Sequence, residues 1–265
     1  MSLNKLKRKA HNLSFFVHIV LFLSTLSASL SAQPAGIPIL TQSHRELTVG
    51  ISGGYFRKDI DGITYTSPRY LVKGVLGLGG FLDLFAEVGV ARVTLEMPDG
   101  QANLSSKYQI AYGVGLNVRY FSLPRYRFSL FVSGQMIRFT SNPSSANLRF
   151  LADTEVLQVL ELKYDWREAS LNTGLTKAWG VVNFYLGVNA KIIQRLETKI
   201  DKIVIDEGSE SVVRQTGEYL SGLETSPFIG LDFSLPSRLT LSLEVVGRNR
   251  SDFAFYLGLS QTGKP

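Results

Sequence analysis

The chain has 265 residues, of which 45% are hydrophobic and 19% are charged, and its formal net charge is +6. This composition is too apolar for a disordered protein and too polar for a bundle of membrane-spanning helices. The chain contains no cysteine, which excludes both a disulfide framework and a lipid anchor on a cysteine.

The first 32 residues are typical of a secretory signal peptide. A basic stretch from Lys5 to Lys9 precedes an apolar run from Phe15 to Leu23, and small residues follow up to Ala32. We place the cleavage site after Ala32, which leaves residues 33–45 as a periplasmic N-terminal segment. An uncleaved anchor is the alternative, but the apolar run is short for a membrane-spanning helix. The mature chain then has 24 basic and 22 acidic residues, a balance that gives no sign of nucleic-acid binding.

Beyond Ala32 the recurring signal is a period-two alternation of apolar and polar residues, which is typical of amphipathic β-strands. In the clearest segment, one apolar set alternates with one polar set: Leu239, Leu241, Leu243 and Val245 against Thr240, Ser242 and Glu244. The pattern predicts about ten strands, at 46–56, 68–78, 83–96, 107–120, 126–140, 157–178, 181–197, 219–233, 238–248 and 251–260. The sixth strand changes parity along its length, and a β-bulge near Glu168 would reconcile its two halves.

The connections between these strands alternate in length. Short turns are expected near 79–82, 122–125, 178–180 and 235–237, and longer polar connections near 57–66, 98–106, 141–156 and 199–217. Short turns at one end and long loops at the other are typical of an outer-membrane barrel, whose short turns face the periplasm. The sequence therefore predicts an all-β fold, a closed antiparallel up-and-down transmembrane β-barrel over residues 46–261, followed by a polar tail at 262–265.

The polar face of the strands distinguishes a membrane barrel from a soluble one. A soluble barrel turns its apolar face inward, whereas a membrane barrel turns that face to lipid. Here the polar face carries charges of both signs, which can neutralise one another in a narrow interior, and glycines that leave room for larger side chains. Seven charged residues are expected to line the lumen and to be available for contact with a solute: Lys73, Glu87, Arg119, Lys191, Glu224, Asp232 and Glu244.

Aromatic residues gather near both expected ends of the strands. Those beside the short turns are Phe81, Tyr120, Phe121, Tyr126, Trp179 and Phe233, and those toward the long loops are Tyr55, Phe56, Tyr70, Tyr164, Trp166 and Tyr219. Two such belts match the preference of Tyr and Trp for the two membrane interfaces.

With its signal peptide, alternating strands, glycine-rich polar face and the Phe-x-Phe-x-Leu-x-Leu ending from Phe253 to Leu259, the chain resembles the small bacterial outer-membrane β-barrel families of about 8–12 strands. The resemblance implies a location in the cell outer membrane. It also implies outer-membrane lipid and, during assembly, the barrel-insertion machinery as partners.

The residues offer little support for catalysis. His44 is the only histidine of the mature chain, and it precedes the first strand on the periplasmic side, so we expect a solvated residue rather than a general base. The acidic residues between Asp201 and Glu210 lack the ligand pattern of a calcium loop. We therefore expect no enzyme activity, no cofactor and no metal.

The leading hypothesis is a non-enzymatic outer-membrane barrel with a lumen that side chains largely fill. Wide aqueous channels need about sixteen or more strands, so we expect a structural or surface-contact role, or the passage of a small solute. Two alternatives remain. One is a soluble periplasmic β-barrel that binds an apolar ligand, and the other is a barrel enzyme that modifies outer-membrane lipid through carboxylates and hydroxyls.

Overall fold

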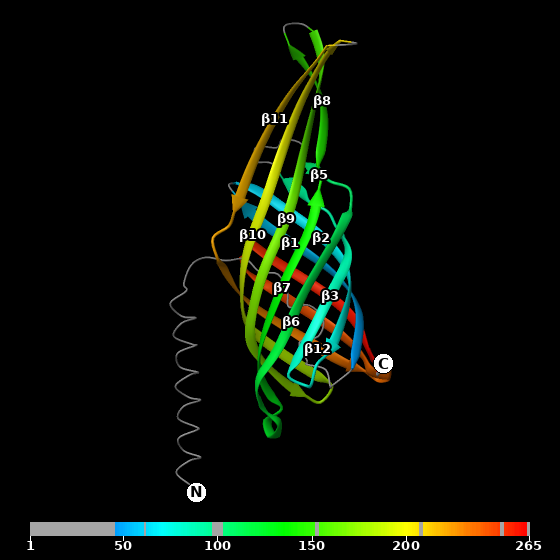
Figure 1. Ribbon diagram of the computed structural model, residues 1–265, viewed down its shortest axis with the longest axis vertical. Coiled ribbons are helices and arrows are strands. Elements are labelled where there is room, and N and C mark those ends of the chain that lie inside the picture. The colour runs from blue at the N-terminus through cyan, green and yellow to red at the C-terminus, as the bar shows by residue number, and fades with distance from the viewer. Residues whose placement is uncertain are drawn as a thin grey trace.

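The computed structural model of the chain describes residues 46–60, 62–96, 103–151, 154–206, 209–249 and 252–263. Within these ranges, ten long antiparallel strands form a barrel (Figure 1). They are β1 (Leu47–Ile60), β2 (Ile63–Gly77), β3 (Leu82–Ala91), β6 (Gln109–Leu123), β7 (Phe128–Ser141), β9 (Thr154–Trp179), β10 (Val182–Asp206), β12 (Glu224–Leu235), β13 (Leu239–Asn249) and β14 (Asp252–Gly263). Each pairs with the next barrel strand, and β14 pairs with β1, so the barrel is closed. The predicted fold class and the ten predicted strands are confirmed.

Four further strands lie at the end of the barrel opposite to the short turns. The small strands β4 (Thr94–Glu96) and β5 (Leu104–Ser105) pair with each other beside β2. β8 (Ser144–Leu151) pairs with β9, and β11 (Ser209–Leu220) pairs with β10. Because β9 and β10 have 26 and 25 residues, the four strands β8, β9, β10 and β11 continue beyond the barrel as a sheet (Figure 1). We call this the extension sheet.

Three connections that were expected to be polar loops are hairpins instead. β1 and β2 stay paired up to Ile60 and Ile63, and the segments 141–156 and 199–217 belong to the β8–β9 and β10–β11 hairpins. The loop prediction was wrong there because these segments are rich in polar and turn-forming residues, although their backbones pair as strands. The predicted short turns are confirmed at 78–81, 124–127, 180–181 and 236–238.

The two faces of the barrel wall have the polarity of a membrane protein. Residues of one parity point into the lumen and are mostly buried, whereas the other face is apolar and exposed. The exposed face includes Val49, Ile51, Val72, Val88, Val114, Met136, Leu186, Ile229, Val245 and Leu257. A continuous apolar band of this kind marks contact with lipid rather than water. The soluble-barrel alternative, which needs the apolar face inside, is therefore wrong.

β9 runs without the bulge that was expected near Glu168. Its pairings with β7 and β10 keep one register, and its even-numbered residues point into the lumen from Leu162 to Thr176. The chemistry of the lumen changes instead, from Tyr164 and Trp166 toward the extension sheet to Ser170 and Asn172 toward the short turns. The hydrophobic pattern of β9 therefore changes parity because its lumen positions change from aromatic to polar residues, and not because the strand has a bulge.

The chain ends meet at the short-turn end of the barrel. β14 runs to Gly263, and the hydroxyls of Thr48 and Thr262 are 2.8 Å apart, so the barrel includes the first two residues of the expected polar tail. Residues 264–265, the expected signal peptide 1–32 and the segment 33–45 with His44 lie outside the described residues. In the part of the chain that is described, no helix is long and apolar enough to cross a membrane.

Candidate functional site

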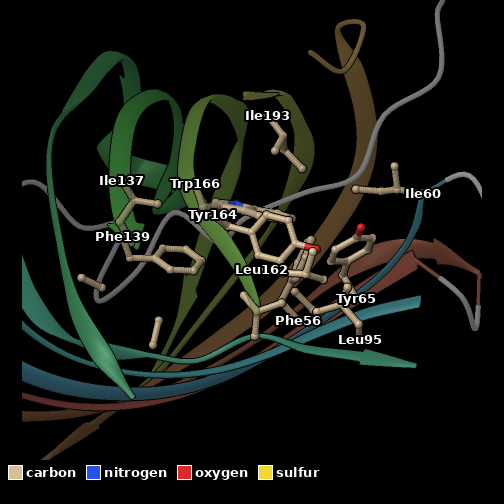
Figure 2. Close-up of a cluster of buried hydrophobic side chains, with 14 of the residues drawn as sticks. Phe56, Ile60, Tyr65, Leu95, Ile137, Phe139, Leu162, Tyr164, Trp166 and Ile193 are labelled. Atoms are coloured by element: carbon tan, nitrogen blue, oxygen red, sulfur yellow. The ribbon is translucent and has the colours of Figure 1, made fainter. Parts of the chain in front are cut away.

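A hydrophobic cluster closes the half of the lumen nearest the extension sheet (Figure 2). Trp166 of β9 lies at its centre, with its ring centroid 6.0 Å from that of Phe139, 6.0 Å from that of Tyr65 and 6.3 Å from that of Phe56. These rings come from β7, β2 and β1, so the cluster joins opposite walls of the barrel. Each of the four rings is at most 2% exposed. We call this cluster the aromatic layer.

The aromatic layer corrects part of the belt prediction. Most aromatics beside the short turns are exposed on the outer face as expected, including Phe81, Tyr120, Phe121, Tyr126 and Trp179. At the other end Tyr55 and Tyr70 are also exposed, but Phe56, Tyr164 and Trp166 point into the lumen. Their assignment to an outer belt was wrong, because the preference of an aromatic residue for a strand end does not say which face it occupies.

A buried ion pair spans the lumen next to the aromatic layer, on its short-turn side. Arg69 of β2 donates to both carboxylate oxygens of Glu168 of β9, at 2.7 and 3.1 Å, and both side chains are fully buried. The guanidinium carbon of Arg69 lies 5.1 Å from the ring centroid of Phe56 and 5.0 Å from that of Phe139, close enough for cation–π attraction. Trp166 also donates its indole N–H to Glu168. The pair therefore fastens the aromatic layer to two facing walls.

Sequence reasoning missed this pair. Arg69 has the same parity in β2 as Lys73, and Glu168 has the same parity in β9 as Trp166, so both could have been placed inside. Their contact could not be predicted, since β2 and β9 are not neighbours and the stagger of the barrel decides which residues meet across the lumen.

Toward the short turns, charged and polar side chains share the lumen with a second, smaller hydrophobic cluster of Phe131, Tyr185, Phe228 and Val246. Lys73 and Glu87 are register partners on β2 and β3, and the Lys73 ammonium lies 3.5 Å from the Phe85 ring centroid. The Gln135 amide of β7 donates to Glu87 at 2.6 Å, across the intervening strand β6. There Gly113 leaves the space, because a Cβ atom at this position would approach the Glu87 carboxylate to 2.7 Å. The expected role of the lumen glycines is confirmed here.

A second glycine has the same role on the other wall. Tyr185 of β10 donates its hydroxyl to Glu244 of β13 at 3.1 Å, and its ring lies over Gly230 of the intervening strand β12. A Cβ atom on Gly230 would collide with this ring. At Gly113 and Gly230, a long side chain thus crosses a neighbouring strand because the glycine leaves the space.

The structure places the seven predicted residues on the lumen side of their strands: Lys73, Glu87, Arg119, Lys191, Glu224, Asp232 and Glu244. They are spread along the lumen and do not form one site. Lys191 lies 4.0 Å from Glu168, Glu224 forms an ion pair with Lys58, and Asp232 accepts hydrogen bonds from its neighbours. Arg119 is half-buried near the short-turn end. Their contact with a solute stays a prediction.

Wall side chains are buried at three levels of the lumen. Asp83 near the short turns is 0% exposed, Lys191 in the middle 0%, and Trp166 near the extension sheet 1%. An open channel would leave such wall side chains in contact with water, as in barrels of about sixteen strands. At these levels the wall side chains are therefore covered by other side chains rather than by an open aqueous channel.

Comparisons with known proteins return outer-membrane barrels at low similarity. No protein-family model matches the sequence, and no curated protein is significantly similar to it. Among solved structures, the translocator domain of the autotransporter NalP from Neisseria meningitidis is 10% identical, with 96% of this chain and 97% of that chain covered and a TM-score of 0.41. The outer membrane protease OmpT from Escherichia coli is 11% identical, with 85% and 100% covered and a TM-score of 0.46. Ail from Yersinia pestis is 9% identical, with 83% and 99% covered and a TM-score of 0.32.

The assignment to the outer membrane rests on the closed barrel and its apolar band, and not on these distant similarities. A closed antiparallel barrel leaves no unpaired strand edge in lipid, and a polar interior with an apolar outer face suits a bilayer. The chain is an outer-membrane β-barrel protein of ten barrel strands.

Proposed function

We propose that this barrel is a non-enzymatic surface protein, which holds the extension sheet outside the cell above a closed lumen. The single observation that carries the proposal is the closure by Trp166 and the Arg69–Glu168 pair directly beneath that sheet. A closed lumen offers no site to a substrate and no path to a large solute. The proposed partners are outer-membrane lipid, which surrounds the apolar band, and the barrel-insertion machinery during assembly.

The exposure of the extension sheet supports a contact role. Residues 211–218 of β11 are exposed on both faces, and β11 pairs only with β10 within the described residues. An unpaired strand edge can accept a further strand from another molecule. Because the short turns of outer-membrane barrels face the periplasm, this sheet would face the surroundings of the cell.

Labelling of single cysteines tests the orientation, since the chain has no cysteine of its own. Val212→Cys lies in β11 and Ser237→Cys in a short turn, and both native side chains are exposed. A maleimide too large to cross the outer membrane should label Val212→Cys on intact cells, but Ser237→Cys only after the membrane is permeabilised. The reverse pattern would contradict the proposal.

Shortening the extension sheet tests the contact role. Asp201 pairs with Val213, and Asn147 pairs with Gln158, so each hairpin can be closed at these pairs by an Asn-Gly turn. The shortened barrel should remain heat-modifiable on gels, because the lumen contacts are untouched. Cells that carry it should sediment more slowly and adhere less to protein-coated surfaces than cells with the full chain. Equal sedimentation and equal adhesion would argue against a contact role.

A second candidate function is the passage of a small polar solute. On the wall formed by β6, β7 and β9, the buried side-chain oxygens of Asn117, Ser133 and Ser170 accept no hydrogen bond from the described residues. Buried polar groups of this kind commonly bind water, and a hydrated strip could admit a molecule of similar size. Swelling of proteoliposomes in glycerol but not in sugars would favour this candidate over the first.

A further inference from the structure

The outer face of the barrel has a groove within its apolar band. It crosses β13, β14, β1 and β2 and has a volume of about 520 Å³. Its lining includes Ile51, Gly53, Tyr70, Val72, Leu257 and Leu259. Gly53 faces outward and provides the depth, since a Cβ atom there would meet only the Tyr70 ring, at 3.5 Å. The volume is within the range of about 300–1,000 Å³ that is usual for small-molecule sites, and an acyl chain is the matching occupant in a bilayer.

The groove continues into a polar cluster at the edge of the apolar band. The ring of Tyr70 lies 5.9 Å from that of Tyr108, and the guanidinium carbon of Arg92 lies 5.2 Å from the Tyr108 ring centroid. Tyrosines are typical of the level of lipid headgroups. Among the described residues, no carboxylate forms an ion pair with Arg92, and its Nε has no hydrogen-bond partner. A guanidinium without a carboxylate partner at this level suits a phosphate group, which an arginine can bind through two hydrogen bonds.

We propose that the groove and Arg92 together bind one phosphorylated glycolipid of the outer leaflet. One acyl chain lies over Gly53 between Ile51 and Leu257, and a headgroup phosphate accepts hydrogen bonds from Arg92. The position of Arg92 agrees with a ligand from the outer leaflet. Arg92 lies at the end of the barrel that bears the extension sheet, and the end opposite to the short turns faces outward in outer-membrane barrels. The site is separate from the lumen and from the extension sheet, so it does not depend on the proposed contact role.

Three variants test the contributions of the groove and of Arg92 to lipid binding separately. Gly53→Leu fills the groove, and the space at Gly53 shows no backbone obstacle. Arg92→Gln removes the charge but keeps a long polar side chain. Gly134→Leu is the matched control, because Gly134 on β7 also faces lipid and has no atom within 4 Å of an added Cβ. Heat-modifiability on gels shows whether each full-length variant folds.

Native mass spectrometry of the purified chain in detergent measures binding of bisphosphorylated lipid A, dephosphorylated lipid A and phosphatidylglycerol. The unmodified chain and Gly134→Leu should retain one bisphosphorylated lipid A. Arg92→Gln should bind it roughly tenfold more weakly, the loss expected for one charge-assisted contact. Gly53→Leu should also bind it more weakly, because the added side chain occupies the place of the acyl chain. Arg92→Gln should also lose the preference for the phosphorylated form.

Three results would overturn the proposal. One is equal retention of lipid A by Gly53→Leu and Gly134→Leu, because the groove would then contribute nothing. Another is equal affinity of the unmodified chain for lipid A with and without phosphate. Binding of phosphatidylglycerol as tightly as lipid A would reject the glycolipid as the ligand.

Discussion

Replacement of Glu168 by Gln is expected to lower the free energy of unfolding by about 3–5 kcal/mol, the usual cost of removing one partner of a buried ion pair. The substitution keeps the shape of the side chain but leaves the guanidinium of Arg69 without its counter-charge. It also leaves Lys191 facing a neutral amide, 4.0 Å from the present carboxylate. Urea unfolding in lipid vesicles, followed by tryptophan fluorescence, measures the change.

Asp165→Asn is the matched control on the same strand. Asp165 also accepts hydrogen bonds from two arginines, Arg138 at 2.8 and 2.9 Å and Arg167 at 2.7 Å, but it points outward above the apolar band and is partly exposed. Exposed ion pairs contribute little because water screens them. The control should change stability far less than Glu168→Gln. Equal changes in the two variants would show that the lumen pair is not shielded from water.

Replacement of Trp166 by Ala is expected to destabilise the barrel by about 3–5 kcal/mol, as for other large aromatic residues in a core. The change removes the centre of the aromatic layer and leaves a cavity between Phe56, Tyr65 and Phe139. It also removes the indole donor to Glu168. The urea concentration at the midpoint of unfolding should fall. On SDS gels, the band of the folded barrel should be replaced by that of the unfolded chain at a lower heating temperature.

The second tryptophan supplies the control. The chain has two tryptophans, and Trp179 at the short-turn end is 85% exposed on the outer face. Trp179→Ala should destabilise the barrel less than Trp166→Ala, since it leaves no cavity. Since each variant keeps one tryptophan, a quencher dissolved in the lipid should reduce the fluorescence of Trp179 in Trp166→Ala more than that of Trp166 in Trp179→Ala. Stronger quenching of Trp166 would place the aromatic layer outside the barrel.

The barrel strands could be predicted because lipid on one side and a polar lumen on the other impose a strict alternation. The segment from Leu239 to Val245 shows this clearly, and its pairing with β12 and β14 follows the expected order. β11 could not be predicted, because its residues 211–218 are exposed on both faces and nothing requires them to alternate. β8 was missed as well, because the segment 141–156 is rich in polar and turn-forming residues.

The contents of the lumen were predicted only in part. Charged residues such as Lys73, Glu87 and Glu244 stood out because they interrupt apolar strands at lumen positions. Phe56 and Trp166 did not, since an apolar residue inside the lumen reads as a break in the pattern or as part of the outer belt. The contacts that close the lumen join strands far apart in the barrel, and only its stagger brings them together.

Planar-bilayer recording on the purified chain tests the closed lumen most directly. With Trp166, Arg69 and Glu168 across the interior and Lys191 at 0% exposure, the inserted barrel should show no large steady current at moderate voltage. Large, steady and non-selective currents would contradict the closed lumen and the surface role proposed on its basis.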